Sequence, residues 1–408
     1  MTGKKSILVL STLDTKGEET RYVKDRLADL GMVPQILDLS MGGKGAFPAE
    51  FPAKQVAQAG GGSIEEIRRS RDRARITRTI TAGASAIAVE LVSKNQIHGV
   101  VGIGGSTGSL MACDVMRSLP FGIPKLMVSS TAALPGLSTR YIGTADIVLF
   151  HSVIEISGLT DLLKNVIDRA VFAMAGMVED AIFPALSGQG KRIALTMLGP
   201  CEKCASAVRK GLEKTGFQVI GFSAAGIGDR AMEEMIQDGF FHGVVDLAPG
   251  GVGEHLFGFM RDAGPDRMES AGKKGIPQII STCSVNHMTP AKSKYKPEYL
   301  NRPKYHLDKH RTWIRLSEEE LQQVARVFAE KLNKAVGPVR VLVPSKGWSA
   351  VDAPGNPSHD PAADQRFLET LRSLMKPEIR VLEVEANMED PSFAEAILLE
   401  AETLFRAC

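Results

Sequence analysis

Short runs of apolar and β-branched residues recur along this chain at intervals of roughly 25–35 residues. Gly, Ser, Thr or Asp follows most of them. Near-continuous apolar runs are typical of parallel strands that have helices packed on both faces. The runs therefore predict buried parallel strands at Ile7–Leu10, Gln35–Leu39, Gly99–Ile103, Lys125–Ser129, Ile147–Phe150, Ile193–Met197, Gln218–Phe222, Val244–Leu247, Gln278–Ser281, Val339–Val343 and Val381–Val384.

Helical periodicity fills several of the intervals between these strands. Ser317 and Glu320 form a capping-box pattern at the start of one interval. Apolar residues then follow at helical spacing, at Leu321, Val324, Ala325, Phe328 and Leu332. The first interval has the same pattern at Val23, Leu27 and Leu30. Strand, loop, helix and strand in repeating order predict an α/β fold with mainly parallel sheets.

The length of 408 residues indicates more than one domain. The best boundary is Phe183–Lys191, where a Pro and two Gly separate a long helical segment, Asp161–Val178, from a new strand. We therefore expect two Rossmann-like α/β domains with a cleft between them. Residues 1–185 form the nucleotide-binding domain in this interpretation, and residues 190–408 form the second.

Composition excludes several classes of function. Lys and Arg number 49 against 47 Asp and Glu, which argues against a nucleic-acid partner. The longest weakly polar stretch, Ile87–Val92, is far shorter than the roughly 20 residues that cross a membrane, so no membrane partner is expected. No secretory signal is visible, and five Cys are an odd number, so we expect a protein of the reducing cytoplasm.

Glycine is enriched, with 40 residues, and one cluster stands at a predicted strand-to-helix turn. The turn reads Gly104-Gly-Ser-Thr-Gly-Ser109, and backbone N–H groups crowd together in such a turn at a helix N-terminus. Ser106, Thr107 and Ser109 add hydroxyl groups. The pattern matches neither the P-loop nor the dinucleotide fingerprint, because no Lys follows and the glycine spacing differs. It therefore predicts phosphate binding, with tight helix–strand packing as the alternative.

A second polar loop, Ser11–Glu18, also leaves a strand and enters a helix. If its strand neighbours the one before Gly104, both loops open onto one crevice. Lys16 is then a candidate to pair with a phosphate, and Asp14 to hold a metal ion or to orient a hydroxyl. Asp38 ends the next strand, where dinucleotide-binding folds place a ribose-binding acid. The alternatives are helix capping for Asp14, a solvated Lys16 and a turn role for Asp38.

Three further groups of residues are candidates. Ser129, Ser130 and Thr131 end another predicted strand and are placed in the same crevice. Arg230 begins a helix in the second domain, where it suits a carboxylate or phosphate of a substrate, with an ion pair to a nearby Glu as the alternative. The arginine-rich segment Arg68–Arg78 favours a solvated helix face of mixed charge, with an anion-binding or subunit-contact surface as the alternative.

Cysteines offer only a weak metal signal. Cys201 and Cys204 form a C-x-x-C pair, and Cys283 and His287 are the remaining candidate ligands. Because no second C-x-x-C exists, no metal site is assigned to these residues.

Several motifs together resemble one known family. They are STLDTKGEE, GIGGSTGS, LPFGIPKLMVSS, YIGTADI, DRAMEEMIQDGFFHGVVDL and SAVDAPGNPSHDP. The sequence resembles a widespread bacterial and fungal family of two-domain proteins, which also forms the N-terminal part of the tomato mosaic virus resistance protein of tomato. The resemblance covers nearly the whole chain.

This resemblance implies an ATP-binding homodimer. It places the nucleotide loop at Gly104, Gly105, Ser106, Gly108 and Ser109, and the first loop at Asp14, Thr15, Lys16 and Gly17. The resemblance also implies that this region of the plant protein binds and blocks the viral replication protein. It further implies that the region is joined there to a barrel domain like that of phosphoenolpyruvate-mutase enzymes. Bacterial members often lie beside a separate gene for such a barrel, which is therefore a candidate partner.

Two classes of function follow. The first is an enzyme that uses ATP and Mg²⁺ to act on a small acidic metabolite in the cleft, by phosphoryl or nucleotidyl transfer or by ligation, with Lys16, Asp14 and Arg230 as candidate catalytic residues. The second is a nucleotide-regulated binding or inhibitory module without catalysis. NAD-dependent reduction is a weaker third, because Asp38 is present but the glycine spacing differs.

Overall fold

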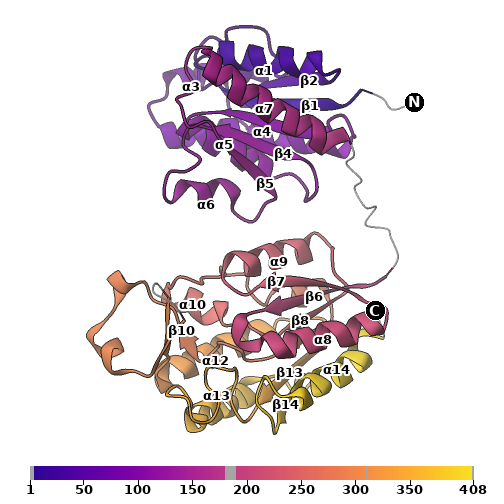
Figure 1. Ribbon diagram of the computed structural model, residues 1–408, viewed down its shortest axis with the longest axis vertical. Coiled ribbons are helices and arrows are strands. Elements are labelled where there is room, and N and C mark those ends of the chain that lie inside the picture. The colour runs from indigo at the N-terminus through magenta and orange to yellow at the C-terminus, as the bar shows by residue number, and fades with distance from the viewer. Residues whose placement is uncertain (1–3, 180–189, 308–310, 407–408) are drawn as a thin grey trace. The chain divides into compact units, whose positions relative to one another are not determined.

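The computed structural model describes residues 4–179, 190–307 and 311–406 (Figure 1). The chain divides into two compact units, Met1–Ala185 and Leu186–Cys408. Most of the proposed boundary segment, Phe183–Lys191, lies outside the described residues. No described helix is both long and apolar enough to cross a membrane.

The N-terminal unit is built on a five-stranded parallel sheet in the order β2-β1-β3-β4-β5. Its strands are β1 (Ser6–Ser11), β2 (Val33–Asp38), β3 (Gly99–Gly104), β4 (Lys125–Ser129) and β5 (Ile147–His151). Its helices are α1 (Gly17–Asp29), α2 (Ala53–Ala59), α3 (Ile64–Arg69), α4 (Arg73–Ser93), α5 (Ser106–Arg117), α6 (Leu137–Ile142) and α7 (Asp161–Glu179).

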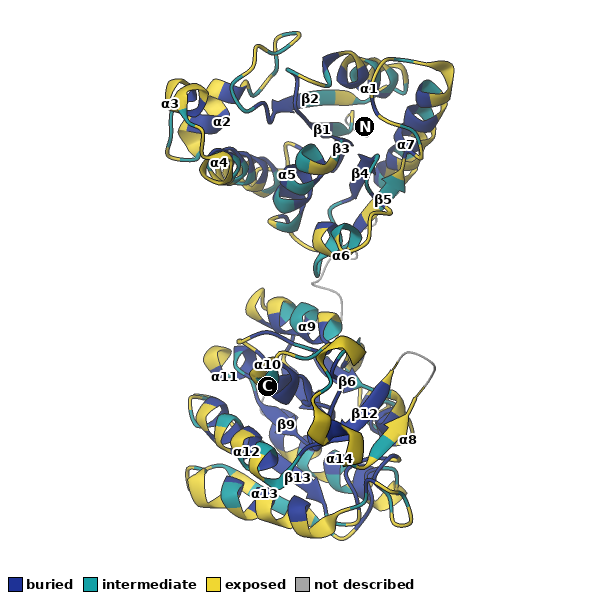
Figure 2. Ribbon diagram, turned by 90° about the vertical axis from the view of Figure 1, so that its left-hand side faces the viewer, coloured by how far each residue is buried: buried dark blue, intermediate teal, exposed yellow. Residues whose placement is uncertain are grey.

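Helices cover both faces of this sheet. Along β1, Leu8 and Leu10 pack in a core with residues of α2, α3, α4 and α5, whereas Ile7 and Val9 pack in a second core with residues of α1 and α7. Successive side chains of a strand point to opposite faces, so a strand between two helical layers is apolar at every position. This is the physical reason for the continuous apolar runs in the sequence, and Figure 2 shows the resulting buried strands between exposed outer faces of helices.

The C-terminal unit is built on a six-stranded parallel sheet in the order β14-β13-β9-β8-β6-β7. These strands are β6 (Arg192–Met197), β7 (Gln218–Ser223), β8 (Gly243–Asp246), β9 (Gln278–Ile280), β13 (Val339–Pro344) and β14 (Arg380–Val384). The α-helices are α8 (Glu202–Lys214), α9 (Ile227–Gln237), α10 (Gly251–Phe257), α11 (Ser270–Lys274), α12 (Glu318–Leu332), α13 (Pro361–Leu374) and α14 (Pro391–Phe405). Short 3₁₀ helices span Gly199–Cys201, Lys292–Lys294 and Pro297–Asn301.

The predicted α/β fold with mainly parallel sheets is confirmed in both units. Each of the predicted apolar runs lies in a strand of one of the two sheets. The predicted capping box at the start of α12 forms: Glu320 N donates to Ser317 Oγ at 3.2 Å, and Ser317 N donates to a Glu320 carboxylate oxygen at 2.8 Å.

A small antiparallel sheet was not predicted. It comprises β10 (His287–Met288), β11 (Lys304–His306) and β12 (Thr312–Arg315), in the order β10-β12-β11. Two to four residues are too few to show a strand period in a sequence. These strands depend on pairing between distant segments, which local pattern does not record.

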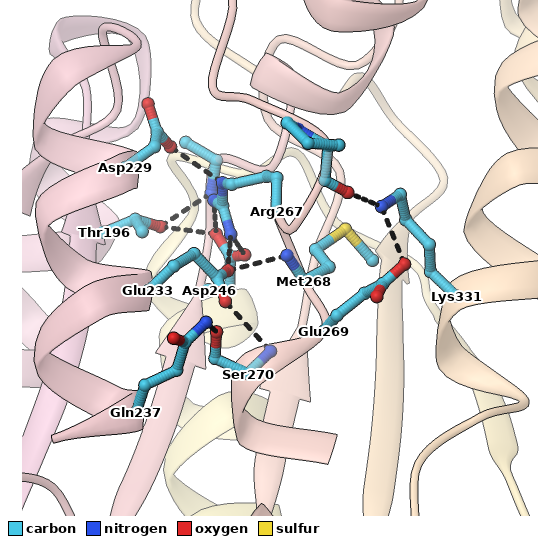
Figure 3. A network of polar contacts seen from close by, with 12 residues as sticks. Thr196, Asp229, Glu233, Gln237, Asp246, Arg267, Met268, Glu269, Ser270 and Lys331 are labelled. Carbon is cyan, nitrogen blue, oxygen red and sulfur yellow. Dashed lines mark hydrogen bonds and ion pairs between the residues drawn. The ribbon is translucent and has the colours of Figure 1, made fainter. Parts of the chain in front are cut away.

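A buried ionic network centred on Arg267 joins α9, β8 and the segment before α11 (Figure 3). Its guanidinium contacts Asp229 at 2.9 Å, Glu233 at 3.2 Å and Asp246 at 2.6 Å. Glu233 also accepts the backbone N–H groups of Met268 and Ser270, at 2.6 and 3.0 Å. Each of the three acids contacts the same guanidinium, so the network links these elements and leaves no acid in it without a cationic partner.

Candidate nucleotide site

The two polar loops singled out in the sequence lie side by side at one edge of the N-terminal sheet. β1 pairs in parallel with β3, so Ser11–Lys16 and Gly104–Gly108 both follow carboxyl ends of neighbouring strands. The chain goes from β1 outward to β2 and then returns to β3 on the other side of β1. Such a reversal of strand order is the place where open α/β sheets bind ligands.

A cavity of about 270 Å³ lies between these loops. Its wall consists of Thr12, Asp14, Thr15, Lys16, Met41, Arg73, Gly105, Ser106, Thr107 and Gly108. This volume is below the roughly 300–1,000 Å³ of pockets that enclose a whole drug-sized ligand. The cavity therefore suits part of a larger ligand, and its two cationic side chains favour an anionic part.

The N-terminus of α5 forms one side of the cavity. Gly105 is the N-cap residue, and no side chain caps the helix there. The first N–H groups of a helix have no acceptor within the helix, and the positive end of the helix dipole lies with them. Here Ser106, Thr107 and Gly108 carry these groups at the cavity wall. A Cβ atom on Gly108 would meet no atom within 4 Å, so the space beside this backbone is open to a ligand.

The loop after β1 forms the opposite side and is held by its own backbone. Thr12 O accepts the N–H groups of Thr15 and Lys16, at 3.1 and 2.8 Å, and the hydroxyls of Thr12 and Thr15 lie 2.8 Å apart. The Lys16 ammonium donates to the Ile156 carbonyl. Lys16 is itself the N-cap residue of α1, and no side chain caps this helix, so the capping alternative for Asp14 is not what the structure has.

Three predicted residues hold the site's framework instead of lining the cavity. Asp38 is buried, and its Oδ1 accepts the Leu13 N–H at 3.2 Å and both the N–H and the hydroxyl of Ser40. Its carboxylate therefore ties two loops together, which is the turn role considered as the alternative to ribose binding. Gly17 is buried and packs closely against Ala46. Gly104 packs against the backbone of Gly108.

The predicted hydroxyl residues are also structural for the most part. Ser109 is fully buried, and its Oγ lies 3.2 Å from the Gly104 carbonyl oxygen and 2.7 Å from Ser129 Oγ. Ser129 is equally buried and accepts the Thr131 N–H at 3.2 Å. Thr131 contacts the Tyr141 hydroxyl at 2.7 Å, and Ser130 contacts Glu155 at 3.4 Å. None of these four residues belongs to the described cavity wall.

Arg73 is the functional candidate that sequence reasoning missed. It begins α4 and lines the cavity together with Lys16 and the N-terminus of α5. The available signal was the arginine-rich segment Arg68–Arg78, which we interpreted as a solvated face. Most of that segment is indeed exposed, but no local pattern distinguishes the arginine that turns toward a distant loop.

Arg230 belongs to the C-terminal unit and is not among the residues of this described cavity wall. It forms an ion pair with Asp262 at 3.5 Å, and both side chains are partly exposed. His255 contacts the same Asp262 oxygen at 2.8 Å. Burial raises the pKa of Asp262, but the hydrogen bond from the Gly264 N–H and the contacts with His255 and Arg230 outweigh it, so the pKa lies below its usual value. Arg230 thus forms an ion pair, as the alternative predicted, but its partner is Asp262 and not a Glu.

The described residues contain no group of three or more His, Cys, Asp or Glu side chains placed to hold a metal ion. Cys201, Cys204 and Cys283 are buried free thiols. Burial raises the pKa values of Cys204 and Cys283 well above the usual thiol value, so both stay protonated at neutral pH. Asp14 is the one carboxylate in the described cavity wall.

Comparison with known proteins places both units in one family. Residues 5–182 match the N-terminal domain, and residues 190–405 the C-terminal domain, of the uncharacterised protein family UPF0261. A UPF0261 protein of Clostridium tetani is 34% identical over 397 residues, which is 96% of this chain and 97% of that protein.

Two tomato proteins are also similar. The ToMV resistance protein Tm-1(GCR237) and the ToMV susceptible protein tm-1(GCR26) of Solanum lycopersicum are each 33% identical to this chain. Each match covers 75% of this chain and 41% of the tomato protein. The family resemblance inferred from the sequence motifs is thus confirmed, while its ATP-binding part stays a prediction. The chain belongs to the UPF0261 family.

Proposed function

We propose that this protein is an ATP-dependent enzyme whose N-terminal unit binds the nucleotide's phosphates at the carboxyl ends of β1 and β3. One observation carries the proposal: Lys16, Arg73 and the uncapped N-terminus of α5 surround one cavity, although they come from three separate parts of the sequence. Two cations and a set of free backbone N–H groups are the chemistry that recognises phosphate. The substrate in this proposal is a small acidic metabolite, and the enzyme is a cytoplasmic homodimer.

Mg²⁺ fits the same cavity. This ion is usually bound by one or two protein carboxylates together with phosphate oxygens and water, and Asp14 supplies one carboxylate at the wall. When bound, the ion would offset phosphate charge. The chain's own residues would hold the phosphates: the amides of α5 fix them, while Lys16 and Arg73 stabilise negative charge that develops on transfer.

A nucleotide-regulated binding or inhibitory module without catalysis is the competing function. The name of one tomato relative refers to resistance to a virus, but the relative named for susceptibility is equally identical to this chain. Similarity to the pair therefore does not favour an inhibitory role. The two functions differ in whether ATP is consumed.

The nucleotide site is tested by titrating ATP and Mg²⁺ into the full chain by calorimetry. We expect Gly108→Ala to keep the fold, because the added methyl group meets no protein atom within 4 Å and Ala favours a helix. The methyl group enters the cavity, so affinity should fall at least tenfold. Lys16→Ala and Arg73→Ala should each lower the affinity for ATP roughly ten- to a hundredfold, as expected for the loss of a hydrogen bond to a charged group.

Arg78→Ala is the matched control, since Arg78 is an exposed arginine of the same helix α4 outside the described cavity wall. Its ATP affinity should equal that of the unmodified protein. Undiminished affinity in Gly108→Ala and Arg73→Ala would place the nucleotide elsewhere. Turnover is then measured with small hydroxy- and keto-acids, with and without a phosphoenolpyruvate-mutase-like barrel protein. ATP binding without product in any combination would reject the enzyme in favour of the binding module.

A further inference from the structure

The C-terminal unit contains a second and larger cavity, of about 800 Å³. It lies at the carboxyl ends of β6 and β7 and is lined by Met197, Leu198, Gly199, Pro200, Glu202, Gly221, Phe222, Ser223, Ala225, Met260, Arg261, Thr289, Leu307, Arg311 and Trp313. In this unit β6 stands between β7 and β8, so the strand order reverses here as it does at β1. The position is again the one at which open α/β sheets bind ligands.

The wall of this cavity is mainly apolar. Met197, Leu198, Phe222, Met260 and Trp313 supply apolar surface from β6, β7, β12 and the segment after α10. A small number of polar groups interrupts it, which is the usual composition of a site for an organic molecule. Its volume lies within the roughly 300–1,000 Å³ range of such sites. An apolar molecular body is therefore the part of a ligand that this wall accommodates best.

Arg261 is the buried charged residue of the described wall, whereas Glu202 and Arg311 are exposed. Its Nε and Nη2 donate to Glu254 Oε1 at 3.2 and 2.9 Å, and its guanidinium lies 4.9 Å from the centre of the Trp313 ring. Glu254 also accepts the Arg261 N–H and the Thr289 hydroxyl, so the acid is fully engaged. The guanidinium is thus held in one orientation before any ligand arrives, and a preorganised group loses little entropy on binding.

The same guanidinium keeps unused donor capacity. Its Nη1 is buried and has no hydrogen-bond partner among the described residues. Both ring nitrogens of the buried His287 are also without a hydrogen-bond partner among the described residues, and its ring centre lies 6.0 Å from that of Trp313. Folded proteins rarely leave buried polar atoms unpaired, so the unpaired Nη1 of this wall residue indicates a place for a polar ligand group.

We infer that this cavity binds a carboxylic acid with an apolar body. The carboxylate pairs with Arg261, and the body lies against Met197, Phe222 and Trp313. Glu254 already engages Nε and Nη2 of Arg261, so the carboxylate of the ligand is expected at the remaining, unpaired Nη1. A guanidinium matches the planar fork of a carboxylate, and an aromatic wall matches an apolar body. Naming this acid as the substrate rests on the proposed function; its binding does not.

The inference is tested with cyclohexanecarboxylate and its neutral amide, cyclohexanecarboxamide, as probes of equal shape. Trp313 is one of two tryptophans in the chain and belongs to the described cavity wall, whereas Trp348 does not, so intrinsic fluorescence and calorimetry both report binding. The carboxylate should bind at least tenfold more tightly than the amide. Arg261→Lys keeps a cation opposite Glu254 but loses the planar guanidinium. This substitution should lower the affinity for the carboxylate about tenfold and leave the affinity for the amide unchanged.

Two further variants make the test sharp. Ala225 is exposed at the cavity wall, so Ala225→Trp should fill the cavity without disturbing the core and abolish binding of both probes. Arg372→Lys is the matched control, because Arg372 is an exposed arginine of α13 outside the described wall, and the affinities for both probes should stay unchanged. Equal affinity for acid and amide, binding that survives Ala225→Trp, or no binding of either probe would each overturn the inference.

The nucleotide site is assayed in the same variants, so that failures can be separated. Arg261→Lys should bind ATP normally, and Gly108→Ala should bind cyclohexanecarboxylate normally. If the acid binds while ATP does not, the proposed function fails and the acid site stands. If ATP binds while the acid does not, the acid site alone is rejected.

Discussion

Arg267 and Arg230 are both arginines of the C-terminal unit, but their ion pairs contribute differently to its stability because one is buried and the other is partly exposed. The Arg267 side chain is fully buried against three acids, whereas that of Arg230 is 42% exposed beside Asp262. Water screens the exposed pair, and most of what it gains is offset by the entropy of holding two long side chains. Removing a buried partner leaves unpaired charge in a medium of low dielectric constant.

We predict that Arg267→Met destabilises the C-terminal unit by roughly 3–5 kcal/mol, because Asp229, Glu233 and Asp246 lose their common cation. Arg230→Met is the control and should cost at most about 1 kcal/mol. Urea unfolding followed by circular dichroism measures both. Equal effects of the two substitutions would show that the buried network does not hold the unit together.

Asp364 predicts a dependence of stability on pH. It is buried, forms an ion pair with Arg315 at 2.6 Å and accepts from Asn286 at 3.2 Å, and burial raises its pKa from 3.8 to about 7. Between pH 4 and 7 the folded state therefore binds a proton that the unfolded state releases. The stability contributed by this carboxyl is full at low pH and is lost as the pH rises toward 7.

Comparison with Asp364→Asn isolates this effect. The stability of the unmodified protein minus that of the variant should fall from pH 4 to pH 7 and stay constant above. Burial lowers the pKa of His287 to about 4, which gives the opposite trend, but His287 is present in both proteins and its contribution cancels in the difference. The measurement is the free energy of unfolding in urea at each pH. A difference that is independent of pH would contradict the assignment.

At the scale of elements, the contact between α2 and α4 depends on glycine. A Cβ atom on Gly83, inside α4, would collide with the Val56 carbonyl, and one on Gly60 would collide with the Thr79 carbonyl. The two helices therefore approach backbone to backbone. This contact positions the start of α4, from which Arg73 enters the candidate nucleotide site.

We predict that Gly83→Ala destabilises the N-terminal unit by at least about 1–3 kcal/mol, the usual cost of overpacking, although Ala is the better helix former. Gly176→Ala is the control, since Gly176 is also helical, is exposed and has no atom within 4 Å of an added Cβ. That substitution should stabilise by up to about 1 kcal/mol. Thermal unfolding measures both, and a stabilising Gly83→Ala would refute the close helix contact.

At the scale of the whole molecule, each unit has its own hydrophobic cores. The core residues of the N-terminal unit all lie between positions 7 and 178 of the chain, and those of the C-terminal unit lie between positions 193 and 405. Each unit therefore has the apolar burial that a domain needs to fold by itself.

We predict that residues 1–182 and 190–408, expressed separately, each unfold cooperatively. In the full chain, ATP should stabilise only the N-terminal unit, because a ligand stabilises the unit that binds it. At an ATP concentration of a hundred times the dissociation constant, the free energy of unfolding of this unit should rise by about 2.7 kcal/mol. Scanning calorimetry with and without ATP measures this. A shift of both transitions, or of the C-terminal one alone, would contradict the proposed site.

The sequence alone determined the fold class and the position of nearly every strand of the two large sheets. This was possible because burial on both faces makes a strand apolar at every position, which is a local property. It also determined that the loops at Ser11–Lys16 and Gly104–Gly108 end strands. The prediction of one shared crevice required that these two strands be neighbours. The sequence did not determine this, because it depends on the order of the strands in the sheet.

Only the tertiary structure decided which polar residues line the cavity. Ser106, Ser109 and Ser129 all lie near the end of a predicted strand, so the sequence does not distinguish them. Ser109 and Ser129 are buried, and their hydroxyls contact each other. Arg73 enters the site from a helix that begins far along the chain, and Arg261 meets Trp313 from a segment with no motif. Such roles depend on contacts between distant segments, and these contacts exist only once helices and sheet have packed.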